Sequence, residues 1–253
     1  MLERKISPEE VELQKKLAEL ARLENELVQA ELELATVQSE IRAFEVHYLH
    51  HVGLQLAYLD ELEAEIAFLN AQNHPDDPEA QDYASEARAQ ADESSQASGA
   101  AESEPEIPAF SPSEELKRLY RDVCKKFHPD LVMDEAERHR RTELMKEINA
   151  AYARGDIARL HELLTGEATA PEAVQGEGIM FELIRVIRKI AQVQTRIEAI
   201  RQKITELQQS EMFQLKTRVS ALEAIGQKPL DDLKLQFEHQ ILEAVGRWYN
   251  AKR

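Results

Sequence analysis

Residues 20–48, LARLENELVQAELELATVQSEIRAFEVHY, decide the fold class because their apolar side chains recur at alternating spacings of three and four. The recurring residues are Leu20, Leu23, Leu27, Ala30, Leu34, Val37, Ile41, Phe44 and Tyr48. This seven-residue repeat is typical of a coiled-coil seam, where a helix buries a narrow apolar stripe against a partner helix. The pattern loosens at residues 47–53 and resumes at residues 56–69, so the helix continues, kinks or turns back near Gly53.

A second repeat of the same kind begins at Ile179. Its members are Ile179, Leu183, Val186, Ile190, Val193, Ile197, Ile200, Ile204 and Leu207. It predicts a second coiled-coil helix, extending to Ile225, and a last amphipathic helix after Gly226 and Pro229. Two pairings stay open: the two repeats pair antiparallel within one chain, or each pairs with a second copy in a homodimer.

Composition also favours an all-α protein, because glycine and aromatic residues are few and Glu, Leu, Ala and Gln are abundant. The net charge of −17 lies mostly in the first half of the chain, which disfavours nucleic acid as a partner. The single cysteine, Cys124, excludes an intrachain disulfide and a paired-cysteine zinc site. No apolar run reaches the roughly 18 residues of a membrane span, so we expect a soluble, cytoplasmic protein.

Residues 73–112 differ from both repeats: they begin with a proline-rich break and then contain few large apolar side chains. Such a segment has little to offset the entropy of ordering, which predicts a disordered, flexible acidic linker. We therefore divide the chain into an N-terminal coiled coil (1–72), this linker (73–112), a helical hairpin (113–165), a second linker (166–178) and a C-terminal coiled coil with a terminal amphipathic helix (179–253).

Residues 113–127, SEELKRLYRDVCKKF, predict the first helix of the hairpin. Ser113 is a suitable N-cap, and the apolar side chains share one face while basic side chains share the other. Pro129 disfavours the helical conformation at His128 and forces a turn. Another helix is expected from about Asp134 to Gly155.

The hairpin resembles the J domain of DnaJ-type co-chaperones. Residues 116–127 are similar to its helix II, His128-Pro129-Asp130 to its loop, and residues 145–152, MKEINAAY, to its helix III. A helix I signature is missing, and Leu131 stands where the family commonly has lysine. We therefore expect another element, the coiled coils or the apolar side chains of residues 157–164, to cover the hairpin's apolar edge.

The resemblance implies a function in which the loop and the basic face of helix II bind a DnaK-type chaperone and couple docking to its ATP hydrolysis. By position, the partner-binding residues are His128, Pro129, Asp130, Lys117, Arg118, Arg121, Lys125 and Lys126. The chain is then not an enzyme and holds no catalytic residue, cofactor or metal, and its coiled coils bind a client or scaffold protein. The alternative is a coiled-coil scaffold whose J-like hairpin no longer stimulates ATP hydrolysis.

A second His-Pro-Asp tripeptide occurs at His74-Pro75-Asp76. It follows no basic amphipathic helix, and no helix like residues 145–152 comes after it. Because the tripeptide is informative only between matching flanks, we interpret this copy as chance.

Overall fold

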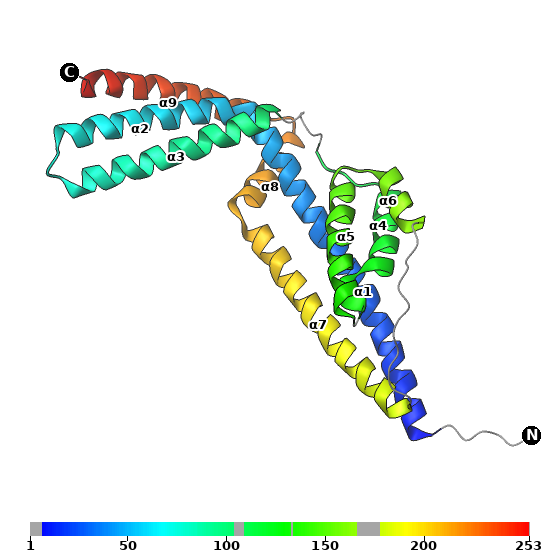
Figure 1. Cartoon of the computed structure of the whole chain (residues 1–253). Helices are drawn as coiled ribbons and strands as arrows, with labels where there is room; N and C mark the ends of the chain where they lie inside the picture. Colours follow the sequence, from blue (N-terminus) through cyan, green and yellow to red (C-terminus); the bar gives the residue numbers. More distant parts are fainter. Residues whose placement is uncertain (1–6, 104–108, 133, 166–177, 253) are drawn as a thin grey trace, which may run out of the picture. The chain divides into compact units, whose positions relative to one another are not determined.

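The computed structural model describes residues 7–103, 109–132, 134–165 and 178–252 (Figure 1). Nearly all of them are helical and none forms a strand, which confirms the all-α class for the described part of the chain. The chain divides into two compact units, residues 1–39 with 111–210 and residues 40–110 with 211–253. Within the described ranges, no helix combines the length and apolar character needed to cross a membrane.

The first unit is built on two long helices, α1 (Pro8–Tyr48) and α7 (Ile179–Gln209), which lie side by side (Figure 1). Their buried seam consists of Leu13, Leu20, Leu23, Leu27 and Ala30 of α1 and Val186, Ile190, Val193, Ile197, Ile200 and Ile204 of α7. Apart from Leu13, these are residues that the two repeats singled out, and in this single chain they pack against one another.

The two helices run parallel, so the antiparallel arrangement is wrong. Ion pairs join Glu24 to Lys189 and Glu31 to Arg196, and both partners advance together along the chain. An apolar seam fits either direction, whereas the charges that flank it select one. Figure 1 shows the same direction, because both helices begin at the same end of the first unit.

Three shorter helices complete the first unit: α4 (Glu114–Phe127), α5 (Glu135–Ala153) and α6 (Ile157–Thr165). Ser113 Oγ caps α4 by accepting the Leu116 N–H, at 3.1 Å. Asp134 Oδ1 caps α5 by accepting the Glu137 N–H, at 2.8 Å. Gly155, with φ +68°, allows the chain to leave α5 and enter α6.

Two tyrosines connect α4 and α5 to α1. The Tyr120 hydroxyl donates to Asn149 Oδ1 of α5 at 2.8 Å and also approaches the Glu31 carbonyl oxygen of α1. The Tyr152 hydroxyl lies 2.9 Å from Thr36 Oγ1 of α1. Leu160 of α6 is fully buried. Helices α1 and α6 therefore cover the apolar edge of the hairpin formed by α4 and α5.

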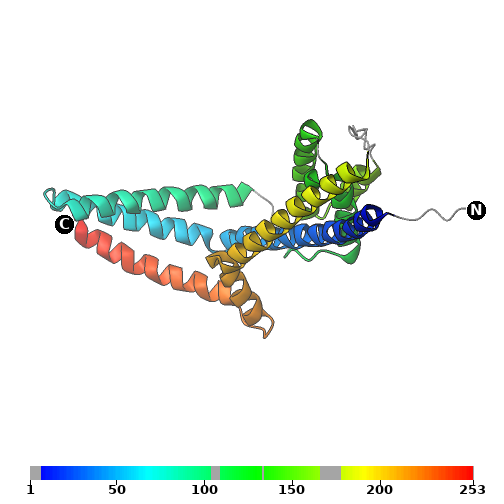
Figure 2. The same ribbon diagram turned by 90° about the horizontal axis from the view of Figure 1, so that it is seen from below.

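In the second unit, α1 continues through a π-helical turn (Leu49–Gly53) into α2 (Leu54–Asn73). Of the three courses open near Gly53, the chain takes the continuous one. Helix α9 (Pro229–Ala251) packs along α2 through Leu62, Ile66 and Ala244 (Figure 2).

The expected single helix from Ile179 to Ile225 is interrupted. Helix α7 ends at Gln209, Ser210 is extended, and a separate helix α8 (Glu211–Glu223) follows. The Ser210 hydroxyl donates to the Leu207 carbonyl oxygen at 2.6 Å, a local bond that competes with continued helix. Gly226, with φ +81°, and Pro229 then separate α8 from α9.

The predicted flexible linker is wrong for residues 78–103, which form a helix, α3 (Pro78–Ser103), packed along α2 (Figure 2). Small side chains share its inner face: Ala80, Ala84, Ala87, Ala91, Ser94, Ser98 and Ala101. They allow close approach, as between Ser98 and Gly53, where a Cβ on the glycine would lie 3.4 Å from the hydroxyl. Residues 104–108, and residues 166–177 of the second predicted linker, lie outside the described residues.

Candidate partner-binding site

The His128-Pro129-Asp130 turn follows directly from the end of α4. Pro129 requires extended backbone before it, and His128 has φ −62° and ψ 130°. Residues 129–131 form one 3₁₀ turn, and the Asp130 N–H donates to His128 Nδ1 at 3.1 Å. The imidazole of His128 therefore packs against the backbone of the turn that it begins.

His128 is buried, with 1% of its surface exposed. Its Nε2 lies 3.1 Å from Glu31 Oε1 on α1. Because Nδ1 accepts the Asp130 N–H, the ring proton of the neutral imidazole belongs on Nε2, which donates to Glu31. Both ring nitrogens are thus engaged inside the protein.

Glu31 is itself buried and receives a second donor. Arg196 of α7 donates to the same Oε1 through Nη2 at 2.9 Å and Nε at 3.2 Å. Burial acts to raise the pKa of Glu31, but the hydrogen bond from His128 and the Arg196 charge outweigh it and hold the pKa below its usual value. The carboxylate is therefore stable as the anion.

Asp130 completes the group. Gln192 Nε2 donates to Asp130 Oδ1 at 3.2 Å, and Arg196 Nε lies 3.7 Å from Asp130 Oδ2. We call Glu31, His128, Asp130, Gln192 and Arg196 the His128 cluster. It joins the turn to both long helices of the first unit.

The sequence predicted His128 and Asp130 but missed the other three members. Glu31 directly follows the seam residue Ala30, and Arg196 directly precedes Ile197, so both flank the predicted seam. That position is typical of interhelical ion pairs. The parallel register, which the sequence leaves open, is what brings them to the turn.

The predicted basic docking residues lie on α4 with differing exposure. Arg118 and Lys125 are exposed, while Lys117, Arg121 and Lys126 are half-buried. Lys117 pairs with Glu114 at 2.8 Å, and Lys125 Nζ donates to Asn25 Oδ1 of α1 at 3.1 Å. The basic face is thus partly engaged by the protein's own polar groups.

Cys124 lies on the opposite, inner side of α4 and is fully buried. Burial strongly raises the pKa of its thiol, and the bond with Tyr120 only partly opposes this. A thiol in this state is a poor nucleophile. Its position is that of an interior packing group.

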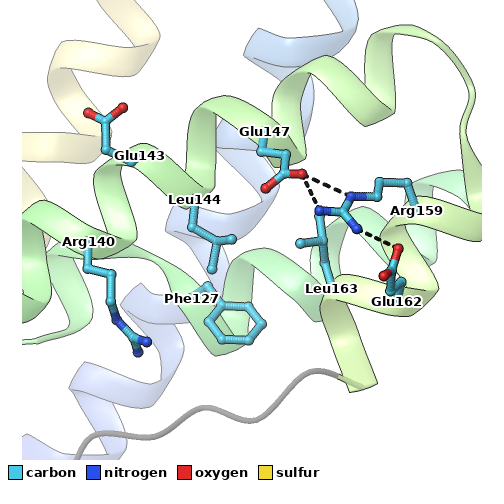
Figure 3. Close-up of a pocket in the computed structure, with 8 residues that line it drawn as sticks. All are labelled: Phe127, Arg140, Glu143, Leu144, Glu147, Arg159, Glu162 and Leu163. Atoms are coloured by element: carbon cyan, nitrogen blue, oxygen red, sulfur yellow. Dashed lines mark hydrogen bonds and ion pairs between the residues drawn. The ribbon is translucent and has the colours of Figure 1, made fainter.

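A cavity of about 500 Å³ opens between α4, α5 and α6 (Figure 3). Its apolar residues are Phe127, Leu144 and Leu163, and charged side chains surround them. Arg159 Nε donates to Glu147 at 2.9 Å, and Arg159 also pairs with Glu162 (Figure 3). Arg159 is therefore paired with one carboxylate of α5 and one of α6.

The second tripeptide has none of this environment. The turn that follows α2 leaves His74, Pro75 and Asp76 exposed, and the His74 ring lies against the carbonyl oxygen of Asn70.

Within the described ranges, no group of three or more His, Cys, Asp or Glu residues is arranged to hold a metal ion. No protein-family model matches the chain, and neither curated proteins nor solved structures provide a match.

Proposed function

We propose that the chain is a co-chaperone that docks on a DnaK-type chaperone through α4 and the His128-Pro129-Asp130 turn and stimulates its ATP hydrolysis. The observation that supports this most is the position of Arg118 and Lys125, exposed on the helix that leads directly into the turn. A basic face next to a carboxylate is suited to orient a partner of complementary charge.

In this function the chain contributes no catalytic group. Basic side chains of α4 attract an acidic patch on the partner, and Asp130 pairs with an arginine of the partner. Docking then favours the hydrolysing conformation of the partner, because a ligand shifts an equilibrium toward the state that it binds more tightly. The chemistry stays within the partner.

A second candidate is a scaffold in which the turn has a structural role only. The buried His128 ring and its bond to Glu31 favour this candidate, because both are the properties of an interior polar group. In that case the long helices hold the partner proteins, and α4 binds no chaperone.

Single-turnover ATP hydrolysis by a DnaK-type chaperone from the same organism separates the two candidates. We expect the full chain to raise the rate, His128→Gln to return it to the basal value, and His74→Gln to leave the stimulation intact. The His74 substitution is a matched control, because it makes the same change in an exposed copy of the tripeptide.

Circular dichroism of each variant establishes that the helices are intact. Equal loss of stimulation in both variants would show that the effect is not specific to the turn at His128. No stimulation by the wild-type chain or by Arg196→Ala, which removes the ion pair on Asp130, would favour the scaffold.

A further inference from the structure

The turn proposed to dock on the chaperone is already bound by the protein's own helices. The Asp130 carboxylate is engaged by Gln192 and Arg196, and the His128 ring by Glu31. We propose that Glu31, Gln192 and Arg196 form a latch that favours the closed turn and weakens docking, because the DnaK-type partner binds only the fraction of molecules in which the latch is released. This inference rests on the proposed function and concerns its regulation.

Occupation of the carboxylate is the first reason. Docking requires Asp130 to pair with a cation of the partner, and Arg196 already places its guanidinium 3.7 Å from Asp130 Oδ2 while Gln192 donates to the other oxygen. A guanidinium is the group best matched to a carboxylate, so Arg196 occupies the place that an incoming arginine needs. The internal and external contacts therefore exclude each other.

Access is the second reason. His128 has 1% of its surface exposed, so a partner cannot reach its ring while the turn is closed. Val132, at the end of the turn, is also buried, and Leu131 packs against the seam of α1 and α7. The closed turn therefore presents only part of the tripeptide to a partner.

The latch is nevertheless built to open. Its contacts with the turn are side-chain hydrogen bonds and ion pairs, and the Arg196 side chain remains 45% exposed to water. Water or a competing charge can replace such bonds one at a time, unlike a large apolar interface. Arg196 is the member that solvent reaches first.

Opening the turn also leaves the rest of the hairpin attached. Tyr152 bonds to Thr36, and Tyr120 bonds to Asn149 and approaches the Glu31 carbonyl oxygen, which is a backbone group. None of these contacts uses a latch side chain. The turn can therefore leave α1 and α7 while α4 and α5 keep their packing.

Amide hydrogen exchange in the full chain measures the latch without reference to any chaperone. The Asp130 N–H is the reporter, because its acceptor is Nδ1 of the same His128 ring whose Nε2 is held by Glu31. We expect Arg196→Ala to speed its exchange by about tenfold or more, the factor that loss of one charge-assisted hydrogen bond produces. Unchanged exchange in Arg196→Ala would overturn the latch.

Arg201→Ala is the matched control. This substitution removes the ion pair between Arg201 and Glu26. That ion pair also joins α7 to α1, but it does not contact the turn. We expect exchange at Asp130 to stay at the wild-type rate in this variant. An equal increase in both variants would mean that any weakening of the helix pair exposes the turn, and this result would also overturn the latch.

Chaperone binding and single-turnover hydrolysis then test the consequence. With Arg196→Ala we expect tighter binding and a higher stimulated rate than with the wild-type chain, and adding His128→Gln to this variant should abolish both. Faster exchange with chaperone binding equal to wild type would overturn the regulatory role. Faster exchange with no chaperone binding by any variant would overturn the proposed function instead, so the two failures are distinguishable.

Discussion

At the scale of single residues, Glu31 is the unusual group of this protein. Burying a carboxylate costs free energy unless hydrogen-bond donors surround it. One oxygen of Glu31 accepts hydrogen bonds from His128 Nε2 and from two nitrogens of Arg196. The carboxylate thus accepts hydrogen bonds from the His128 ring and is paired with the Arg196 cation. The stability of the first unit should depend on the ionisation of this single side chain.

The pH dependence of unfolding tests this dependence. The pKa of Glu31 is lowered in the folded chain from a reference value of 4.5. Its contribution to stability is therefore complete above the unfolded pKa and is lost as the pH falls through the folded pKa. We expect Glu31→Gln to lower the free energy of unfolding by about 1–3 kcal/mol near neutral pH, and the difference from wild type to shrink in acid.

Urea unfolding followed by circular dichroism over a pH series provides the measurement. Glu33→Gln is the control, because it makes the same change at an exposed position of the same helix. Equal effects of the two substitutions, or a Glu31 effect that grows in acid, would contradict the role assigned to the buried carboxylate.

Sequence reasoning reached two of the five members of this cluster, His128 and Asp130, for a physical reason. The identity of His128 and Asp130 is visible in a local motif, whereas Glu31 and Arg196 are two charges among many that flank the seam. What distinguishes them is the register of α1 against α7. No local spacing encodes that register, because the apolar seam fits both directions.

At the scale of helices, α3 shows how packing can stabilise a segment that composition alone predicts to be disordered. Its inner face carries alanines and serines, which bury little apolar area but let α2 approach. Polar contacts support the pair: Arg88 donates to both oxygens of Glu61, and Ser94 bonds to Asp60. An isolated helix of this composition is marginal, so the contact with α2 decides its state.

Enlarging one of the small side chains should disrupt this contact. Ala91 is fully buried against the neighbouring helix, so we expect Ala91→Leu to cost about 1–3 kcal/mol through overpacking. Ala89→Leu places the same side chain on the exposed face of α3 and should be close to neutral. Thermal unfolding of the second unit, followed by hydrogen exchange of α3, distinguishes the two variants.

If Ala91→Leu left exchange and stability unchanged, the close approach of α2 and α3 would be contradicted.

The small side chains of α3 also explain why the sequence predicted a flexible linker at residues 78–103. The periodicity of α1 and α7 was predictable because leucine, isoleucine and valine mark their seams. The same spacing occurs in α3, but in residues too small to register as an apolar stripe.

At the scale of the whole chain, each of the two units has its own apolar clusters. The first is held by the seam of α1 and α7, and the second by clusters around Phe44 and Leu62. Residues distant in the sequence supply each cluster. Within the described residues, the seam of α1 and α7 is buried inside one chain.

Carbodiimide cross-linking tests this intrachain pairing. Lys189 Nζ lies 3.0 Å from Glu24 Oε1, so we expect an amide bond between them within one chain. In a mixture of isotopically light and heavy chains, the cross-linked peptides should be uniformly light or uniformly heavy. Mixed-isotope peptides as the main product would show that the helices pair between copies, and Lys189→Arg removes the reactive amine as a control.

Cys124 gives the molecule a property that follows from its burial on the inner face of α4. It is the single cysteine of the chain, it is fully enclosed, and burial raises its pKa so that little thiolate forms. A thiol reagent can therefore react only when α4 separates from its neighbours. The labelling rate of the unmodified chain thus reads out the frequency of that separation, with no probe to introduce and no competing site to subtract.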